Sequence, residues 1–236
     1  MIAVLSPHLD DAVLSAWTAL RGAEPAVVVN VFDGVPPAGT LSGWDRITGA
    51  TDSSERMRER LEEDRRGLAV AGSASASLGL LEDQYRDGRP QDPAELGDAL
   101  AAATADAGEL WAPAGIGGHG DHVAVRDWAL GPAARGRRVR LYADIPYAVR
   151  HGWPAWVTDA DPDPYFSHDL WWERFMPGDG VVLEAAAHSL SGEEVRLKLR
   201  ALAEYRTQLA GVDSSPLTLV THPLVIGHEV SWGVAP

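Results

Sequence analysis

Apolar residues along this chain follow two alternating patterns, short runs that are wholly or mostly apolar and longer segments with helical spacing. The short runs are typical of buried parallel strands, and they cover residues 2–5, 27–32, 110–112 and 139–143. The helical spacing predicts helices, over residues 12–20, 53–71, 92–107, 123–130 and 191–210. Strands that alternate with helices predict an α/β fold with a mainly parallel sheet and helices on both faces.

Capping residues set the expected ends of the helices. Ser53 or Ser54 is the expected N-cap of the helix over 53–71, and Gly72 is expected to end it. Gly211 is expected to end the last long helix.

Two segments depart from the alternation. Residues 33–52 are rich in proline and glycine and are long enough for a loop that faces a substrate. Residues 145–179 are rich in proline, aspartate and aromatics and predict an irregular excursion. We expect its tryptophans, Trp153, Trp156, Trp171 and Trp172, to pack in the core or between subunits rather than to stack on a sugar. No repeat or boundary divides the chain, so we expect one domain over residues 1–236.

Composition narrows the classes of protein and partner. The net charge of −14 and the pI near 4.9 argue against nucleic acid and anionic membranes as partners. The absence of cysteine excludes disulfides, thiolate nucleophiles and cysteine-bound zinc. The start of the chain is unlike a signal peptide, and no apolar run reaches about 20 residues, so we expect a cytoplasmic location. The sequence leaves open whether copies assemble into a homo-oligomer.

Two clusters of histidine and aspartate follow predicted strands. His8-Leu9-Asp10-Asp11 comes after the first strand, and His119-Gly120-Asp121-His122 comes after the strand over 110–112. Turns that follow parallel strands can meet at one edge of the sheet. They would then offer His8, Asp11 and His122 to one metal ion. Two imidazoles and one carboxylate with an open position are typical of catalytic zinc, and ferrous iron uses similar ligands, whereas magnesium and calcium prefer oxygen.

The two clusters resemble the motifs of the LmbE-like, or PIG-L, family of zinc-dependent sugar N-deacetylases. That family carries an HPDDE-type motif near its N-terminus and an HPDH-type motif near the middle. Three looser matches are the charged helix ending at Gly72, the segment Asp144-Ile145-Pro146-Tyr147, and the late helix with Lys198, Tyr205 and Gln208. The matches run from residue 3 to about 229. The resemblance implies a Rossmann-like three-layer α/β sandwich.

The resemblance also implies a role for each residue of the motifs. His8, Asp11 and His122 match the family's ligands for one zinc ion, and Asp10 matches its general base. His119 matches the histidine that protonates the leaving amine or steadies the oxyanion, and Asp121 matches an orienting carboxylate.

Three positions depart from the family pattern. Leu9 and Gly120 stand where the family has proline, and Ala12 stands where it has glutamate. These changes lie at positions that support the ligands and not at the ligands themselves. The contact that the family's glutamate makes is therefore missing here or supplied by another residue.

The sequence therefore predicts a zinc-dependent hydrolase that removes the N-acetyl group from an amino sugar, such as an N-acetylated glycoside or a natural-product intermediate. Two alternatives remain open at this point. One is a metal-dependent hydrolase of a non-sugar amide or ester, and the other is a non-catalytic protein that binds sugar or metal.

Overall fold

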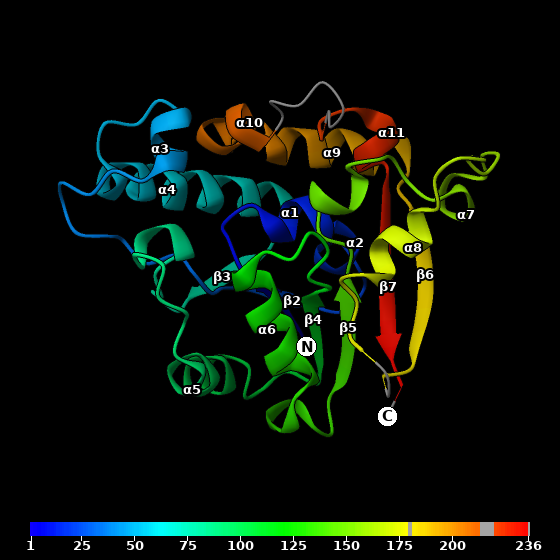
Figure 1. Ribbon diagram of the computed structural model, residues 1–236, viewed down its shortest axis with the longest axis horizontal. Coiled ribbons are helices and arrows are strands. Elements are labelled where there is room, and N and C mark those ends of the chain that lie inside the picture. The colour runs from blue at the N-terminus through cyan, green and yellow to red at the C-terminus, as the bar shows by residue number, and fades with distance from the viewer. Residues whose placement is uncertain (179–180, 213–219, 236) are drawn as a thin grey trace.

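The computed structural model describes residues 1–178, 181–212 and 220–235. In these residues one seven-stranded sheet has the order β3-β2-β1-β4-β5-β7-β6 (Figure 1). Its strands are β1 (Ile2–Ser6), β2 (Ala26–Asn30), β3 (Ala74–Ser77), β4 (Glu109–Pro113), β5 (Arg138–Tyr142), β6 (Leu183–Ser189) and β7 (His228–Val234). The strands β3, β2, β1, β4 and β5 are parallel, whereas β7 is antiparallel to both β5 and β6.

The order of the strands places three carboxyl ends side by side. β1 lies next to β4, and β4 lies next to β5, all parallel. The turns that follow these three strands therefore leave the sheet at the same edge, where open α/β sheets bind their ligands. This confirms that the two histidine and aspartate clusters meet.

Helices form two groups, one on each side of the sheet. The first group comprises α1 (Asp11–Ser15), α2 (Trp17–Leu20), α4 (Ser53–Ala71), α9 (Gly192–Leu202) and α10 (Arg206–Val212). The second comprises α5 (Pro93–Ala103) and α6 (Gly120–Leu130), and Figure 1 shows the two groups on opposite sides. Shorter helices are α3 (Gly43–Ile47), α7 (Ala155–Thr158), α8 (His168–Glu173), α11 (Pro223–Ile226) and the 3₁₀ turns η1 (Asp83–Tyr85), η2 (Pro132–Ala134) and η3 (Tyr147–Val149).

The four predicted strands are confirmed within one or two residues, but three others were not predicted. β3 and β6 lie at the two edges of the sheet and consist largely of small or polar residues that are exposed or half-buried. β7 is mostly buried, but it contains Ser231 and Gly233, which do not favour strands. Neighbouring strands, rather than an apolar run, determine these three.

Two predicted helices are interrupted, so those predictions were wrong in detail. The helix expected over 12–20 breaks at Ala16, where the backbone N–H groups of Trp17 and Thr18 donate to the carboxylate of Glu229 at 2.8 Å each. The helix expected over 191–210 breaks before Arg206, and Gly211 lies inside α10 rather than ending it.

Asp52, rather than Ser53 or Ser54, is the N-cap of α4. Its Oδ1 accepts the backbone N–H groups of Ser54 and Glu55. Gly72 ends α4 in the left-handed conformation, with φ of +76°, as predicted.

The core lies on both faces of the central strands. Trp17, Phe32 and Tyr142 are fully buried, and the hydroxyl of Tyr142 donates to the carbonyl of Leu5 at 2.7 Å. In the excursion, Trp153 and Trp172 are buried as expected, and Trp172 packs edge-on against Trp232 of β7 with ring centroids 5.4 Å apart. Trp171 is half-buried and Trp156 is exposed, so core packing was wrong for Trp156. In the described part of the chain, no helix combines the length and the apolar character needed to cross a bilayer.

Asp64 of α4 couples stability to pH. Its buried carboxylate accepts hydrogen bonds from Asn30 and Tyr205, yet burial raises its pKa to about 7. The folded protein therefore binds a proton here between about pH 4 and 7 that the unfolded chain releases, so this group makes stability fall as the pH rises through that range.

We expect Asp64→Asn to remove much of this pH dependence. Since one pKa unit corresponds to about 1.4 kcal/mol, the free energy of unfolding of the wild type should fall by about 2–3 kcal/mol more between pH 5 and pH 7 than that of the variant. Urea unfolding at the two pH values measures this difference. Equal slopes in the two proteins would show that Asp64 is ionised throughout.

Candidate metal centre

The first cluster occupies the turn between β1 and α1. The Oγ of Ser6 donates to the carbonyl of His8 at 2.6 Å and accepts the backbone N–H of Ala12 at 3.0 Å, which closes the turn. Asp10 is the N-cap residue of α1, and Asp11 is its first residue. The Oδ2 of Asp11 accepts the backbone N–H of His8 at 2.8 Å, so the carboxylate lies beside the imidazole.

The second cluster opens α6 after β4. His119 is the N-cap, and its Nδ1 accepts the backbone N–H of Asp121 at 3.3 Å. Asp121 and His122 lie in the first turn of α6 and are buried. The two clusters thus approach each other from neighbouring strands.

Three side-chain atoms from the two clusters converge on one point. The Nε2 of His122 lies 3.2 Å from the Nδ1 of His8 and 3.3 Å from the Oδ2 of Asp11, and the last two atoms are 3.5 Å apart. A tetrahedral ion with ligands at about 2.0–2.1 Å has donor atoms about 3.3–3.4 Å apart. The three predicted ligands therefore have the spacing that a tetrahedral metal site requires.

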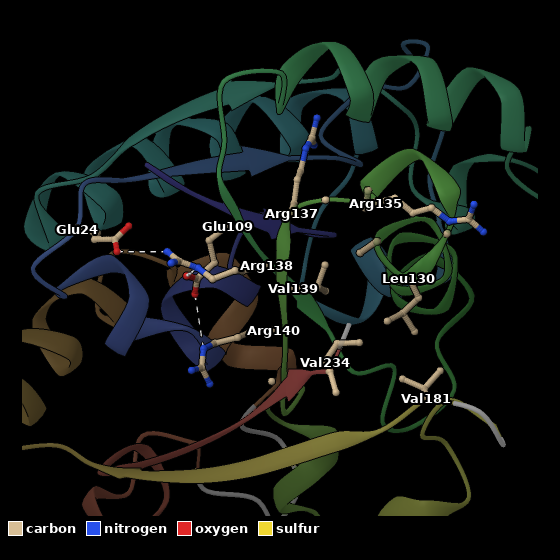
Figure 2. Close-up of a pocket in the computed structure, with 16 residues that line it drawn as sticks. Glu24, Glu109, Leu130, Arg135, Arg137, Arg138, Val139, Arg140, Val181 and Val234 are labelled. Carbon is tan, nitrogen blue, oxygen red and sulfur yellow. Dashed lines mark hydrogen bonds and ion pairs between the residues drawn. The ribbon is translucent and has the colours of Figure 1, made fainter.

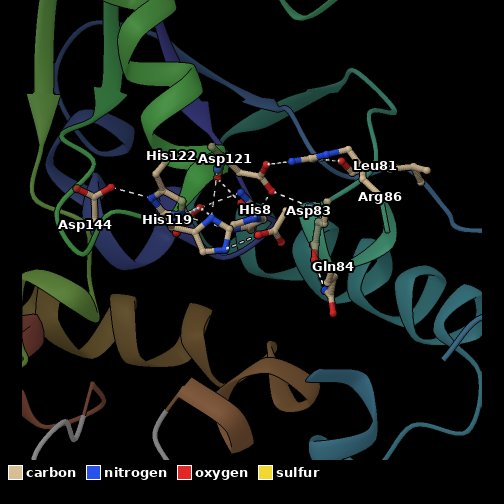
Figure 3. Close-up of polar contacts among 12 residues, drawn as sticks. His8, Leu81, Asp83, Gln84, Arg86, His119, Asp121, His122 and Asp144 are labelled. Atoms are coloured by element: carbon tan, nitrogen blue, oxygen red, sulfur yellow. Dashed lines mark hydrogen bonds and ion pairs between the residues drawn. The ribbon is translucent and has the colours of Figure 1, made fainter. Parts of the chain in front are cut away.

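The outer nitrogen of each imidazole faces a carboxylate (Figure 3). The Nε2 of His8 lies 3.2 Å from the Oδ2 of Asp121, and the Nδ1 of His122 lies 2.7 Å from the Oδ1 of Asp144. A neutral imidazole carries one proton, which these carboxylates draw to the outer nitrogen. The two inner nitrogens are then acceptors 3.2 Å apart beside a carboxylate oxygen, an arrangement that a cation stabilises.

The net charge around the imidazoles of His8 and His122 is the one that a divalent ion would balance. Asp11, Asp121 and Asp144 contribute three negative charges, and Arg86, whose Nη2 donates to the Oδ1 of Asp121 at 2.6 Å, contributes one positive charge. With both imidazoles neutral, two negative charges remain. One divalent metal ion balances them, so the residues present fit such an ion.

The two neighbouring aspartates of the first cluster differ in acidity. Burial and the charge of Asp11 raise the pKa of Asp10 to about 6. Burial opposes ionisation of Asp11, but the charges of His122 and His8 outweigh it and hold its pKa at about 2. Asp11 is thus a permanent anion, and Asp10 is the more basic carboxylate.

His119 lies beside the three donors, with its ring centroid 4.8 Å from that of His8. Its nitrogens come within 4.8 Å of those of His8 and His122, so it is a rival ligand by distance alone. However, the backbone N–H at its Nδ1 leaves the proton of the neutral ring on Nε2. Burial and the two neighbouring imidazoles lower its pKa. In this tautomer Nε2 is a hydrogen-bond donor.

The structure brings all six predicted site residues together and adds others. Asp121 contacts the ring of His8, and only its backbone N–H contacts His119. Asp144 follows β5, the third strand of this edge, and that position was the signal for its role. Arg86 lies on a turn 35 residues before Asp121 and 75 residues after Asp11, and no sequence pattern marked it.

The three departures from the family pattern lie at supporting positions. Leu9 is buried against Met57 and Tyr85, and Ala12 is buried in the main core. A Cβ atom at Gly120 would meet nothing within 4 Å, so the glycine is not required there by packing.

The three donors open into a cavity of about 330 Å³. The clusters contribute His8, Asp10, Asp11, His119 and His122 to its lining. Other lining side chains come from α3, α4, the segment after β5, and α10, among them Trp44, Arg60, Glu82, Tyr147 and Gln208. Both segments that depart from the strand and helix alternation thus reach this cavity, through Trp44 and Tyr147.

A larger cavity of about 1150 Å³ lies at the start of β5, whereas Asp144 lies beyond the end of that strand (Figure 2). Its rim is basic and includes Arg135, Arg137, Arg138 and Arg140. None of the predicted site residues lines it. The chemistry of the two clusters therefore belongs to the smaller cavity.

The contact between Asp144 and His122 predicts a measurable effect on metal binding. Asp144→Asn removes the charge that holds the proton on Nδ1 of His122. In the wild type the other oxygen, Oδ2, accepts the N–H of Ile116 at 2.9 Å, and asparagine has only one oxygen for these two N–H groups. We expect metal affinity to fall by about 10–100-fold. Competition with a chelating dye measures it.

Asp127→Asn is the matched control, because Asp127 is exposed on α6, the helix that carries His122, and among the described residues its carboxylate pairs only with Arg126. An Asp144→Asn protein that binds metal as tightly as this control would contradict the assigned contact.

No family model matches the chain. Among curated proteins, it is similar to a 2'-N-acetylparomamine deacetylase of Streptomyces fradiae, with 34% identity over 167 residues that cover 61% of this chain and 57% of that protein. The chain thus spans little more than half the length of this curated relative.

Solved structures agree over nearly the whole chain. One is a triple mutant of a deacetylase from the teicoplanin biosynthetic pathway, with 25% identity, a TM-score of 0.76, and coverage of 99% of this chain and 97% of that chain. Another is the deacetylase of the A40926 pseudoaglycone, with 25% identity, a TM-score of 0.76, and coverage of 99% and 96%. The α/β fold is confirmed, and the chain is similar in sequence and in fold to deacetylases, as the resemblance of its motifs predicts.

Proposed function

We propose that this chain is a zinc-dependent deacetylase that removes the N-acetyl group from an amino sugar in a glycoside intermediate of the aminoglycoside or glycopeptide type. The observation that carries the proposal is the convergence of His8, Asp11 and His122 at the cavity that also presents Asp10 and His119. The similarity to deacetylases of such intermediates supports it.

His8, Asp11 and His122 would hold the ion, one per chain. Imidazole nitrogen and one carboxylate favour zinc, and ferrous iron is the alternative. Bound there, the ion would polarise the amide carbonyl and lower the pKa of a water molecule from about 15.7 to about 7.

Asp10 would act as the general base. Its carboxylate faces the cavity and caps no helix N–H, so it is available to take the proton of the attacking water. His119 would carry its proton on Nε2 and donate a hydrogen bond from it to the oxyanion, while the proton that Asp10 takes from the water passes to the amine as the carbon–nitrogen bond breaks. The products are acetate and a free amino sugar.

The rest of the cavity would orient the sugar. The buried guanidinium of Arg60 lies 2.5 Å from the carboxylate of Glu82, and Gln84 contacts the same carboxylate. The Nε of Arg60 has no hydrogen-bond partner in the described part of the chain. A cavity of about 330 Å³ is at the lower end of small-molecule sites. It would admit one acetamido sugar and leave the remainder of a larger glycoside outside.

The test is acetate release by protein freed of metal with a chelator and reloaded with one equivalent of zinc, ferrous iron or magnesium. The panel contains N-acetylglucosamine, N-acetylated aminoglycosides and glycopeptides, and simple amides and esters. We expect zinc or iron to restore acetate release from an amino sugar. Turnover restricted to non-sugar amides or esters would favour the first alternative, and metal binding without any turnover would favour a non-catalytic protein.

A further inference from the structure

We propose that Arg86 is a positioning residue for the metal centre, acting through Asp121 on the ring of His8. The inference rests on the proposed function and deepens it. Arg86 follows η1, and its Nη2 donates to the Oδ1 of Asp121 at 2.6 Å, while the Oδ2 of Asp121 faces the Nε2 of His8 at 3.2 Å. Figure 3 shows these three side chains in a row that continues through His122 to Asp144.

Arg86 is itself held in place on several sides. Its Nη1 donates to the carbonyl of Leu81 at 2.5 Å, and its Nε donates to the carbonyl of Arg89 at 3.1 Å. Its guanidinium also lies over the ring of Phe32, 5.3 Å from the centroid. Because the planar fork is fixed by these contacts, little conformational freedom is left to lose when it binds Asp121.

The turn that carries Arg86 fixes Asp121 from a second direction. The backbone N–H of Asp83 donates to the Oδ2 of Asp121 at 3.1 Å. The carboxylate thus receives Arg86 on one oxygen, and His8 and Asp83 on the other. A carboxylate with three donors has little freedom to turn, so it holds the ring of His8 with Nε2 outward and Nδ1 toward the metal position.

Arg86 also supplies charge where it is needed. Asp121 is fully buried, and a buried carboxylate without a cationic partner is costly. Arg86 supplies that cationic partner, at 2.6 Å from the Oδ1 of Asp121, so the carboxylate that holds the ring of His8 is not left buried without a positive charge beside it.

Arg86 does not line the cavity of about 330 Å³, so it acts through Asp121 rather than on a substrate. This separates it from Arg60, which lines the cavity. The expected signature is a loss of metal affinity with the KM for substrate unchanged at saturating metal.

The experiment measures zinc affinity by competition with a chelating dye in Arg86→Met, Arg86→Lys, Asp121→Asn and the double variant Arg86→Met/Asp121→Asn. Arg89→Met is the control, because it removes the same charge from an exposed side chain on the same turn. We expect Arg86→Met to weaken zinc binding by about tenfold, since supporting contacts of this kind affect affinity by about 10–100-fold. Arg86→Lys should recover part of the loss, and Arg89→Met should stay within twofold of the wild type.

The double variant tests the route of the effect. If Arg86 acts through Asp121, Arg86→Met should add little to Asp121→Asn. Additive losses, or zinc affinity within twofold of the wild type in Arg86→Met, would overturn the inference. If Arg86→Met unfolds, the same comparison is made with Arg86→Lys, Asp121→Asn and the double variant Arg86→Lys/Asp121→Asn.

Failure of the inference and failure of the proposed function are distinguishable. Wild-type protein that binds zinc but releases no acetate from any amino sugar overturns the proposed function, while the affinity comparison still decides the role of Arg86. Wild-type protein that deacetylates, with Arg86→Met unchanged in zinc affinity, overturns only the inference.

Discussion

Asp10→Asn is expected to lower kcat for deacetylation by about 10²–10⁴-fold, because an amide cannot accept the proton of the attacking water. The substitution is nearly isosteric, and the Asp10 side chain makes no cap hydrogen bond that would be lost. It also leaves His8, Asp11 and His122 in place. Zinc should therefore remain bound at one equivalent per chain.

Acetate release at saturating substrate and metal analysis of the same sample measure the two quantities. Asp127→Asn, an exposed change of the same kind on α6, should keep the activity of the wild type. Activity of Asp10→Asn within tenfold of the wild type, with zinc bound, would mean that another group takes the proton.

Lys198→Met is expected to lower the free energy of unfolding by about 3–5 kcal/mol, since it leaves a buried carboxylate without its partner. The Nζ of Lys198 is fully buried and lies 2.6 Å from the Oε1 of Glu229. Burial lowers the pKa of Lys198, and Glu229 opposes that shift. Glu229 also accepts the N–H groups of Trp17 and Thr18, so this pair joins α9 and β7 to the start of α2, next to the helix that carries Asp11.

The double variant Lys198→Met/Glu229→Gln should recover a large part of that stability, because it removes both buried charges while a side-chain oxygen remains to accept an N–H group. Urea unfolding of the wild type, the single variant and the double variant measures the difference. A loss below about 1 kcal/mol for Lys198→Met would show that water or another group stabilises the carboxylate of Glu229 in place of Lys198.

The residues of the metal centre could be predicted because ligand chemistry is local. His8 and Asp11 follow one apolar strand, and His122 follows another, so parallel strands bring them to one edge. The partners of the imidazoles were harder to predict. Asp144 follows a third strand and was noticed only as part of a motif, and Arg86 comes from a turn whose path depends on its packing against Phe32 and Asp121.

The secondary structure likewise divides into elements set by local sequence and elements set by distant contacts. The four strands with mostly apolar runs were predicted, because burial on both faces of a sheet selects such runs. β3, β6 and β7 were missed, since their pairing partners determine them more than their own residues do. The break at Ala16 depends on Glu229, more than 200 residues later in the chain.

By itself, the sequence determined the α/β alternation, the two clusters and the three candidate metal ligands, because strand burial and ligand chemistry depend on residue type and short spacing. Tertiary structure alone decided which carboxylate faces which imidazole nitrogen. It also decided that Arg86 pairs with the buried Asp121. These features depend on atomic distances between segments far apart in the chain, which long-range packing sets.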